Sequence, residues 1–490
     1  MNESIEPDAM VDQSEREPTN EGHGDRSSLM DLLMKFLESS GNILLIRGSP
    51  GTGKTTLALE LLRRMEGPSI GQRTVPPNRL YVSSRVSPTK LRRQFPWINE
   101  IVDLGSGRKG SVSLSEGARF FQISEAESIL SKILTVKHSQ QRSLIVIDSW
   151  DGALRNTTEE GRLMLESAIL SEPEESKANV VLVSEDGQTN YLSHLVDGVV
   201  TLSSAKLEGR RVRALFVNKL RGIRVREDQG LFSLDKGRFT FLSAAELFDD
   251  SLARVKILKP IEHSEASFST GSLDLDKMLK GGVRRGSSLL WDLDNTVSSL
   301  EARLLRRIIC ANFVNLGGGC IIVPSSTISS EFVAEDLGRS VGEKALDERV
   351  RIAEFDKALP VKKWRLPLKG NLEDDVSSFV SCWKQLNAVS SAIVLVSDFD
   401  KIAQVYGEDL FLPALANMGA SVRDSGALSL GIASRPTKLR EDFLRVADYH
   451  LKMRNIDKSL VTFGIKPFTN IHGVEFSSQK GLSMKLTEIV

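Results

Sequence analysis

Cysteine and aromatic side chains are scarce in this sequence, and its formal net charge is zero. The chain of 490 residues has three cysteines, Cys310, Cys320 and Cys382, and none of them stands in a close-spaced ligand pair. No stretch approaches the roughly 20 apolar residues that a membrane span requires, and the first residues lack the basic and apolar regions of a secretory signal. These absences predict a soluble protein of the reducing cytoplasm that has no membrane partner.

The balance of charge argues against a general nucleic-acid binder. Lys plus Arg and Asp plus Glu both number 64, so no bulk positive field would hold the chain on nucleic acid. Basic residues do cluster at 90–93, 210–213, 221–226 and 303–307. The arginines of 210–213 alternate as they would on a solvated strand face, those of the last cluster lie on an amphipathic helix, and few aromatics stand between them for base stacking. DNA or RNA is therefore an unfavoured partner, and such a patch could equally dock a protein.

The chain is too long for one compact core, and its pattern divides it into four parts. Residues 1–27 are rich in Glu, Asp, Asn, Ser and Pro, which predicts a disordered acidic tail. In residues 28–243 short apolar runs alternate with amphipathic stretches, and closely spaced strands without helices come after them, which predicts a mainly parallel sheet flanked by helices and finished by antiparallel hairpins. Residues 244–264 read as a connector. Residues 265–490 repeat the same order, so we expect a tandem of two related α/β domains.

A phosphate-binding loop follows the first apolar run. Residues 48–55 match the pattern G-x-x-x-x-G-K-[ST] between a predicted strand and a predicted helix. In such a loop the glycines let backbone N–H groups point at an anion, the lysine reaches the β- and γ-phosphates, and the last hydroxyl ligates Mg²⁺. A chance glycine-rich turn is the alternative. The sequence predicts that ATP and Mg²⁺ are held by Gly48, Ser49, Pro50, Gly51, Thr52, Gly53, Lys54, Thr55 and Thr56.

A carboxylate for the magnesium site stands at the end of another apolar run. Asp148 follows residues 144–147, so we expect it to share the metal with Thr55. A helix cap or strand-end turn is the other explanation for this aspartate. Ser149 follows it where AAA-type ATPases carry a catalytic glutamate, which disfavours that class.

Later motifs make a family resemblance specific. The first half resembles KaiC-type ATPases of the RecA superfamily through Ile147-Asp148-Ser149, Leu182-Val183-Ser184-Glu185, Leu195-Val196-Asp197-Gly198-Val199-Val200 and Lys219-Leu220-Arg221-Gly222. The opening of the second half, at 269–271 and 281–286, resembles another such domain. The resemblance implies two RecA-like P-loop NTPase domains and a homo-oligomer in which Lys219 and Arg221 reach the γ-phosphate of a neighbouring subunit. With Lys54 and Asp148 these are the expected catalytic residues, although two exposed hairpin cations are the plainer explanation of the last pair.

A narrower resemblance concerns the second apolar run and the residues after it. Residues 81–88 and 94–97 make the first half similar to the P-loop domain of the GvpD family of archaeal gas vesicle regulators. Members of that family act against a transcriptional activator. The resemblance therefore implies a regulatory archaeal protein whose partner is a transcriptional regulator.

The chain departs from the KaiC pattern at the catalytic carboxylates. Those ATPases carry a glutamate pair before a Ser-Pro, whereas this chain has Arg85-Val86 before Ser87-Pro88. A guanidinium cannot accept a proton at neutral pH, so general-base assistance from that position is lost. Hydrolysis should be slow unless Glu185 or Asp151 substitutes.

The second domain departs further. Its counterpart of the phosphate loop, residues 290–299, has neither glycine nor lysine, and Asp292 and Asp294 would repel a triphosphate. Ser397 occupies the expected place of the magnesium aspartate, with Asp398 beside it. We therefore expect a degenerate domain that binds no nucleotide.

Together these features predict an ATP-binding regulatory protein. Slow ATP hydrolysis or binding alone would control its oligomeric state or its hold on a protein partner. Two alternatives stay open at this point. One is an active, DNA-stimulated RecA- or RadA-like ATPase of recombination or repair, and the other is a non-catalytic scaffold.

Overall fold

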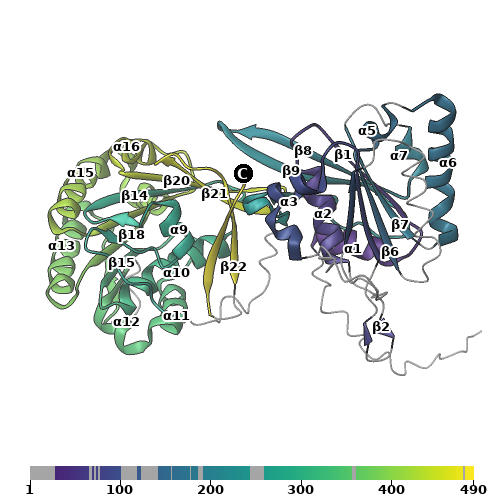
Figure 1. Ribbon diagram of the computed structural model, residues 1–490. Coiled ribbons are helices and arrows are strands. Elements are labelled where there is room, and N and C mark those ends of the chain that lie inside the picture. The colour runs from purple at the N-terminus through teal and green to yellow at the C-terminus, as the bar shows by residue number, and fades with distance from the viewer. Residues whose placement is uncertain are drawn as a thin grey trace, which may run out of the picture.

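In the computed structural model the chain forms two α/β domains that meet through their antiparallel strands (Figure 1). The structure describes residues 28–65, 69–70, 73–74, 78–100, 118–122, 142–155, 157–176, 178–185, 191–242, 259–355, 360–477 and 481–490. The expected tail, 1–27, and most of the expected connector, 244–258, lie outside these ranges. Within them, no helix is both long enough and apolar enough to cross a membrane.

The first domain is built on a nine-stranded sheet in the order β11-β10-β9-β8-β1-β7-β6-β4-β5. The strands from β8 to β5 in this order run parallel, whereas β8 to β11 pair antiparallel. The strands are β1 (Ile43–Gly48), β4 (Asn78–Ser83), β5 (Arg119–Gln122), β6 (Ser143–Asp148), β7 (Ala178–Ser184), β8 (Gly198–Leu207), β9 (Arg210–Leu220), β10 (Gln229–Ser233) and β11 (Thr240–Phe241), with a separate hairpin of β2 (Ser69–Ile70) and β3 (Arg73–Thr74).

Helices cover both faces of this sheet. The side chains of a strand alternate between its faces, and in these strands both sets are apolar and need to be buried. In β1, Leu44 and Ile46 pack in one core with α1 and α2, while Ile43 and Leu45 pack in the other with α5, α6 and α7. The helices are α1 (Leu29–Glu38), α2 (Lys54–Arg64), α3 (Pro88–Gln94), α5 (Trp150–Leu154), α6 (Glu159–Ser176) and α7 (Leu192–Leu195), with a 3₁₀ helix η1 (Pro96–Glu100).

The second domain repeats this topology. Its ten-stranded sheet has the order β17-β16-β15-β18-β19-β14-β20-β21-β22-β23, which places β14 where β1 lies, β18 where β6 lies, and β17 as an additional edge strand. The strands are β14 (Ser287–Leu293), β15 (Gly319–Val323), β16 (Val350–Glu354), β17 (Arg365–Pro367), β18 (Ile393–Asp398), β19 (Leu428–Ala433), β20 (Tyr449–Ile456), β21 (Ser459–Lys466), β22 (His472–Ser477) and β23 (Ser483–Glu488), preceded by the pair β12 (Ser267–Phe268) and β13 (Val283–Arg284). The tandem α/β fold predicted from the sequence is confirmed.

The helices of the second domain also lie on both faces of its sheet. Trp291 of β14 belongs to the core that contains α10, while Leu290 belongs to the core that contains α14 and α15. The helices are α9 (Leu273–Met278), α10 (Ser299–Asn315), α11 (Ser330–Val341), α12 (Glu343–Arg349), α13 (Leu372–Val389), α14 (Phe399–Tyr406), α15 (Glu408–Ser425) and α16 (Lys438–Val446). By position, α10 is the counterpart of α2.

Four arginines of the basic clusters are buried, and for Arg210 and Arg213 this corrects the expectation of a solvated strand face. Arg210 and Arg213 lie against the second domain, where main-chain oxygens of that domain accept hydrogen bonds from both guanidinium groups. Arg306 and Arg307 lie inside the second domain, and Arg307 pairs with Asp336 at 3.3 Å. The periodicity correctly predicted a strand and a helix at these positions. It could not show that the strand packs against a distant part of the chain.

Candidate nucleotide-binding site

The loop at 48–53 joins β1 to α2 and is shaped by its glycines. Gly48, Gly51 and Gly53 all have positive φ angles, of 151°, 79° and 106°. A Cβ atom on Gly48 would lie 2.3 Å from the main-chain oxygen of Leu202, so this position also lacks room for a side chain. The predicted phosphate loop therefore has the strand, turn and helix that such a loop requires.

Lys54 opens α2 and turns back into this loop. Its side chain is largely buried, and its Nζ donates to the main-chain oxygens of Gly48 at 2.5 Å and Ser49 at 3.0 Å. The ammonium group thus lies on the inner side of the loop, next to the N-terminus of α2. Backbone amides and the helix dipole favour an anion at such a place.

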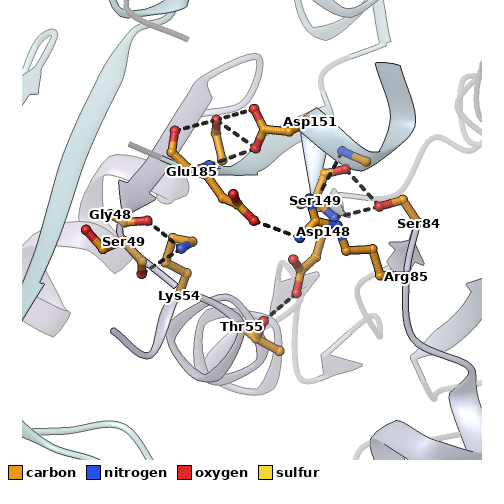
Figure 2. A network of polar contacts seen from close by, with 12 residues as sticks. Gly48, Ser49, Lys54, Thr55, Ser84, Arg85, Asp148, Ser149, Asp151 and Glu185 are labelled. Atoms are coloured by element: carbon orange, nitrogen blue, oxygen red, sulfur yellow. Dashed lines mark hydrogen bonds and ion pairs between the residues drawn. The ribbon is translucent and has the colours of Figure 1, made fainter. Parts of the chain in front are cut away.

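Thr55 and Asp148, predicted from separate motifs, are brought together. Thr55 Oγ1 donates to Asp148 Oδ2 at 2.6 Å (Figure 2). Tyr81, on β4 beside β6, donates its hydroxyl to the same oxygen at 2.5 Å, and burial, with the Asp148 charge adding to it, raises the Tyr81 pKa well above its usual value. Sequence reasoning missed Tyr81, for which the signal was a phenol hydroxyl within the short apolar run at 80–82. The hydroxyl of Thr55 and the carboxylate of Asp148 thus provide two oxygens that suit a hard cation, and Tyr81 orients the carboxylate.

Glu185 lies across the site from Asp148. It follows β7, the strand between β1 and β6, and its side chain extends between Lys54 and Arg85 (Figure 2). Arg85 NH1 and Glu185 Oε1 are 2.7 Å apart. The hydrogen bond from Arg85 lowers the pKa of Glu185. Burial opposes this effect, and the charges of Arg85 and Lys54 lower the pKa further. Arg85, which takes the place of the family's glutamate, therefore binds a carboxylate at the end of β7, across the intervening strand β6.

Asp151 holds Glu185 in place rather than facing the loop. Its carboxylate accepts hydrogen bonds from Ser184 Oγ at 3.0 Å and from the Glu185 main-chain N–H at 2.7 Å. A second link joins Ser84 and Ser149, where the Ser149 N–H donates to Ser84 Oγ at 3.1 Å. The ends of β4, β6 and β7 are thereby fixed to one another. Of the two substitutes considered for the missing base, Glu185 is the one whose carboxylate faces Lys54.

Lys219 and Arg221 lie at the opposite end of the sheet. Lys219 Nζ donates to the main-chain oxygen of Val196 at 2.6 Å, and Arg221 pairs with Asp197 at 3.2 Å. The neighbouring Gly198 pairs with Leu44, four residues before Gly48, which is about 13 Å along a strand. Within one chain these two cations are not brought together with the phosphate loop.

The counterpart loop of the second domain is closed by its own side chains. Glu301, in the first turn of α10, accepts a hydrogen bond from the Ser298 main-chain N–H at 2.6 Å, so a carboxylate already stands at this helix N-terminus. Asn455 of β20 donates to the main-chain oxygen of Thr296 at 2.7 Å. Asp292 is buried and paired with Arg440 at 2.5 Å. The first residue of α10 is Ser299, where α2 begins with Lys54.

The sheet register corrects the expected counterpart of Asp148. Asp148 pairs through β7 with Ile46 of β1, and Asp398 pairs through β19 with Trp291 of β14. Since Ile46 and Trp291 occupy the same position in the two strands, Asp398 rather than Ser397 takes the aspartate's place. Burial raises the Asp398 pKa to about 6, and this carboxylate caps α14 through the Lys401 N–H at 2.9 Å.

Comparison with known proteins agrees with this architecture. The family model for the KaiC ATPase matches residues 30–243. Protein GvpD2 of Halobacterium salinarum is 27% identical over 488 aligned residues, which cover 93% of this chain and 95% of that protein. Protein GvpD1 of the same organism is 23% identical over 524 aligned residues, covering 94% and 96% of the two chains. Residues 30–243 therefore form a KaiC-like ATPase domain of the RecA superfamily, within a chain that resembles the GvpD proteins over nearly its whole length.

Proposed function

We propose that this chain is an ATP-binding regulatory protein in which Mg-ATP at the loop of the first domain controls its oligomeric state or its hold on a protein partner. The observation that carries the proposal is the meeting of Lys54, Thr55 and Asp148 at the N-terminus of α2. Amides at a helix N-terminus and a lysine ammonium attract phosphate oxygens, while a hydroxyl and a carboxylate suit Mg²⁺. The residues of the loop, Gly48 to Thr56, would surround the phosphates.

The chemistry of the site supports slow hydrolysis. The carboxylate that faces Lys54 is Glu185, and we propose that it orients the attacking water. Its ion pair with Arg85 makes it a weaker base, since a carboxylate that is already hydrogen-bonded to a cation accepts a proton less readily. Lys219 and Arg221 would complete the site only from a neighbouring subunit, which is why the proposal includes a homo-oligomer.

The second domain is proposed to bind no nucleotide. Glu301 supports this, because its carboxylate stands at the N-terminus of α10, where a phosphate loop would present amides. Asp292, on the strand before the loop, is already paired with Arg440. A triphosphate there would meet negative charge at the helix N-terminus instead of N–H donors. The proposed role of the second domain is to respond to the nucleotide state of the first domain.

The partner is proposed to be a protein, such as a transcriptional regulator, in line with the similarity to the GvpD proteins. The rival function is a DNA-stimulated ATPase. The burial of Arg210, Arg213 and Arg307 removes part of the basic surface that such an enzyme would need.

The test compares ATP binding and turnover of the wild type and Lys54→Ala, with and without single- or double-stranded DNA, while light scattering follows the molar mass. We expect Mg-ATP to bind to the wild type alone and to change its molar mass or its retention of a protein partner. Turnover that rises several-fold with DNA would support the rival, and equal ATP binding by both proteins would refute the proposed site.

A further inference from the structure

The phosphate loop is linked to the second domain by two bridges, one formed by a single residue and the other by two adjacent residues. The surrounding interface is apolar, with residues of β9 and β10 packed against residues of β21 and the strands beyond it. Figure 1 shows β21 and the C-terminal end between the two domains. The apolar cluster is formed by Val212, Ala214, Leu231, Leu242, Val461, Phe463, Ile471 and Ile489.

The first bridge is Arg213 on β9. Its NH1 donates to the main-chain oxygen of Gly51, inside the phosphate loop, at 2.9 Å, and its Nε donates to the main-chain oxygen of Val490. The residue is only 4% exposed, and both of these acceptors are main-chain oxygens. A buried guanidinium that depends on main-chain oxygens is costly to leave unpaired, so its two partners cannot move independently.

The second bridge is the end of β10. Leu234 packs on the loop so closely that a Cβ atom on Gly53 would lie 2.8 Å from Leu234 Cδ1. The preceding residue, Ser233, donates its hydroxyl to the main-chain oxygen of Glu488, at the end of β23. Two adjacent residues, the last of β10 and the one after it, thus contact the second domain and the loop respectively.

A third contact of the same interface does not reach the loop. Arg210, three residues before Arg213 on β9, donates to the main-chain oxygens of Thr469 at 2.6 Å and Gly464 at 2.5 Å. Its guanidinium also lies over the ring of Phe468 at 3.9 Å. Arg210 therefore anchors the second domain without contacting residues 48–55, and it provides a matched control for Arg213.

We propose that Arg213 and the pair Ser233-Leu234 couple the nucleotide state of the phosphate loop to the docking of the second domain, so that the degenerate domain is the output of the site. Phosphate binding draws the amides of the loop toward the anion and displaces the Gly51 oxygen and Gly53 against their partners. Because the loop and residues 488–490 share these partners, a change in one alters the stability of the other, and the coupling is reciprocal. This inference rests on the proposed binding of ATP at residues 48–56.

Hydrogen exchange of the full chain, with and without Mg-ATP, tests this coupling. The readout is exchange in the peptide that covers residues 481–490, and ATP binding is measured separately by calorimetry. In the wild type we expect ATP to change the exchange rate of this peptide by about 5-fold or more. Arg213→Lys keeps the charge but cannot reach both oxygens, and Leu234→Ala breaks the other bridge. Both variants should still bind ATP and lose most of the response, whereas Arg210→Lys should keep it.

The outcomes separate the two proposals. ATP that binds to the wild type without changing exchange in 481–490 would overturn the coupling and leave the proposed function standing. So would a full response in both Arg213→Lys and Leu234→Ala, with circular dichroism confirming that each is folded. A wild type that binds no ATP at all would instead overturn the proposed function, and the coupling with it.

Discussion

Replacing Glu185 by Gln separates its proposed role in hydrolysis from its contribution to folding. The side chains of Arg85 and Glu185 are 41% and 32% exposed, and a pair of that exposure contributes about 0.2–1 kcal/mol to stability. Loss of a general base, in contrast, slows a reaction about 10²- to 10⁴-fold. That factor corresponds to about 2.7–5.4 kcal/mol in activation free energy. Glu185→Gln should therefore abolish most turnover while changing the free energy of unfolding by no more than about 1 kcal/mol.

The assay is phosphate release under single-turnover conditions, with ATP binding and urea unfolding measured on the same preparations. Asp148→Asn is a useful comparison, because it should lower turnover and also make ATP binding less dependent on Mg²⁺. Turnover of Glu185→Gln within about threefold of the wild type, at unchanged ATP affinity, would refute the role given to Glu185, since a general base is worth far more.

The same contacts give four further predictions. Arg85→Ala removes the hydrogen bond that holds the Glu185 pKa low. The acid limb of the pH profile of turnover, where the base becomes protonated, should therefore move to higher pH, and an unmoved limb would contradict this. Tyr81→Phe should raise the Mg²⁺ concentration needed for half-maximal ATP binding by about 10-fold, because Asp148 loses its orienting donor. Mixing Lys54→Ala subunits with Arg221→Ala subunits should restore part of the turnover that each lacks alone, and no recovery would argue against action between subunits. Phe463→Ala, fully buried between the domains, should cost about 3–5 kcal/mol in the urea transition that separates them.

The parts of the site that lie close together in sequence could be predicted, since a local pattern specifies them. The loop at 48–55 and the strand that ends at Asp148 were both identifiable in this way, and alternating apolar runs indicated the parallel sheets. The contacts of Tyr81 with Asp148 and of Arg85 with Glu185 could not be predicted, because they depend on the order of the strands in the sheet. The predicted counterpart of Asp148 was wrong by one position, since only the sheet register distinguishes Asp398 from Ser397.

The burial of Arg210 and Arg213 shows a different limit. A strand with alternating arginines has the same pattern whether it faces water or a second domain whose main-chain oxygens satisfy its donors. Such a partner surface lies some 250 residues further along the chain, since the contacts of Arg210 with Thr469 and Gly464 span 259 and 254 positions. Packing between domains, rather than local propensity, decided this part of the structure.

We propose that the chain has one functional phosphate loop, in its first domain. Isothermal titration calorimetry of the wild type with Mg-ATP measures the number of nucleotides bound per chain. We predict one nucleotide per chain, lost in Lys54→Ala and kept in Asp292→Asn. Two nucleotides per chain, or one that persists without Lys54 and disappears when residues of the second loop are changed, would contradict the claim.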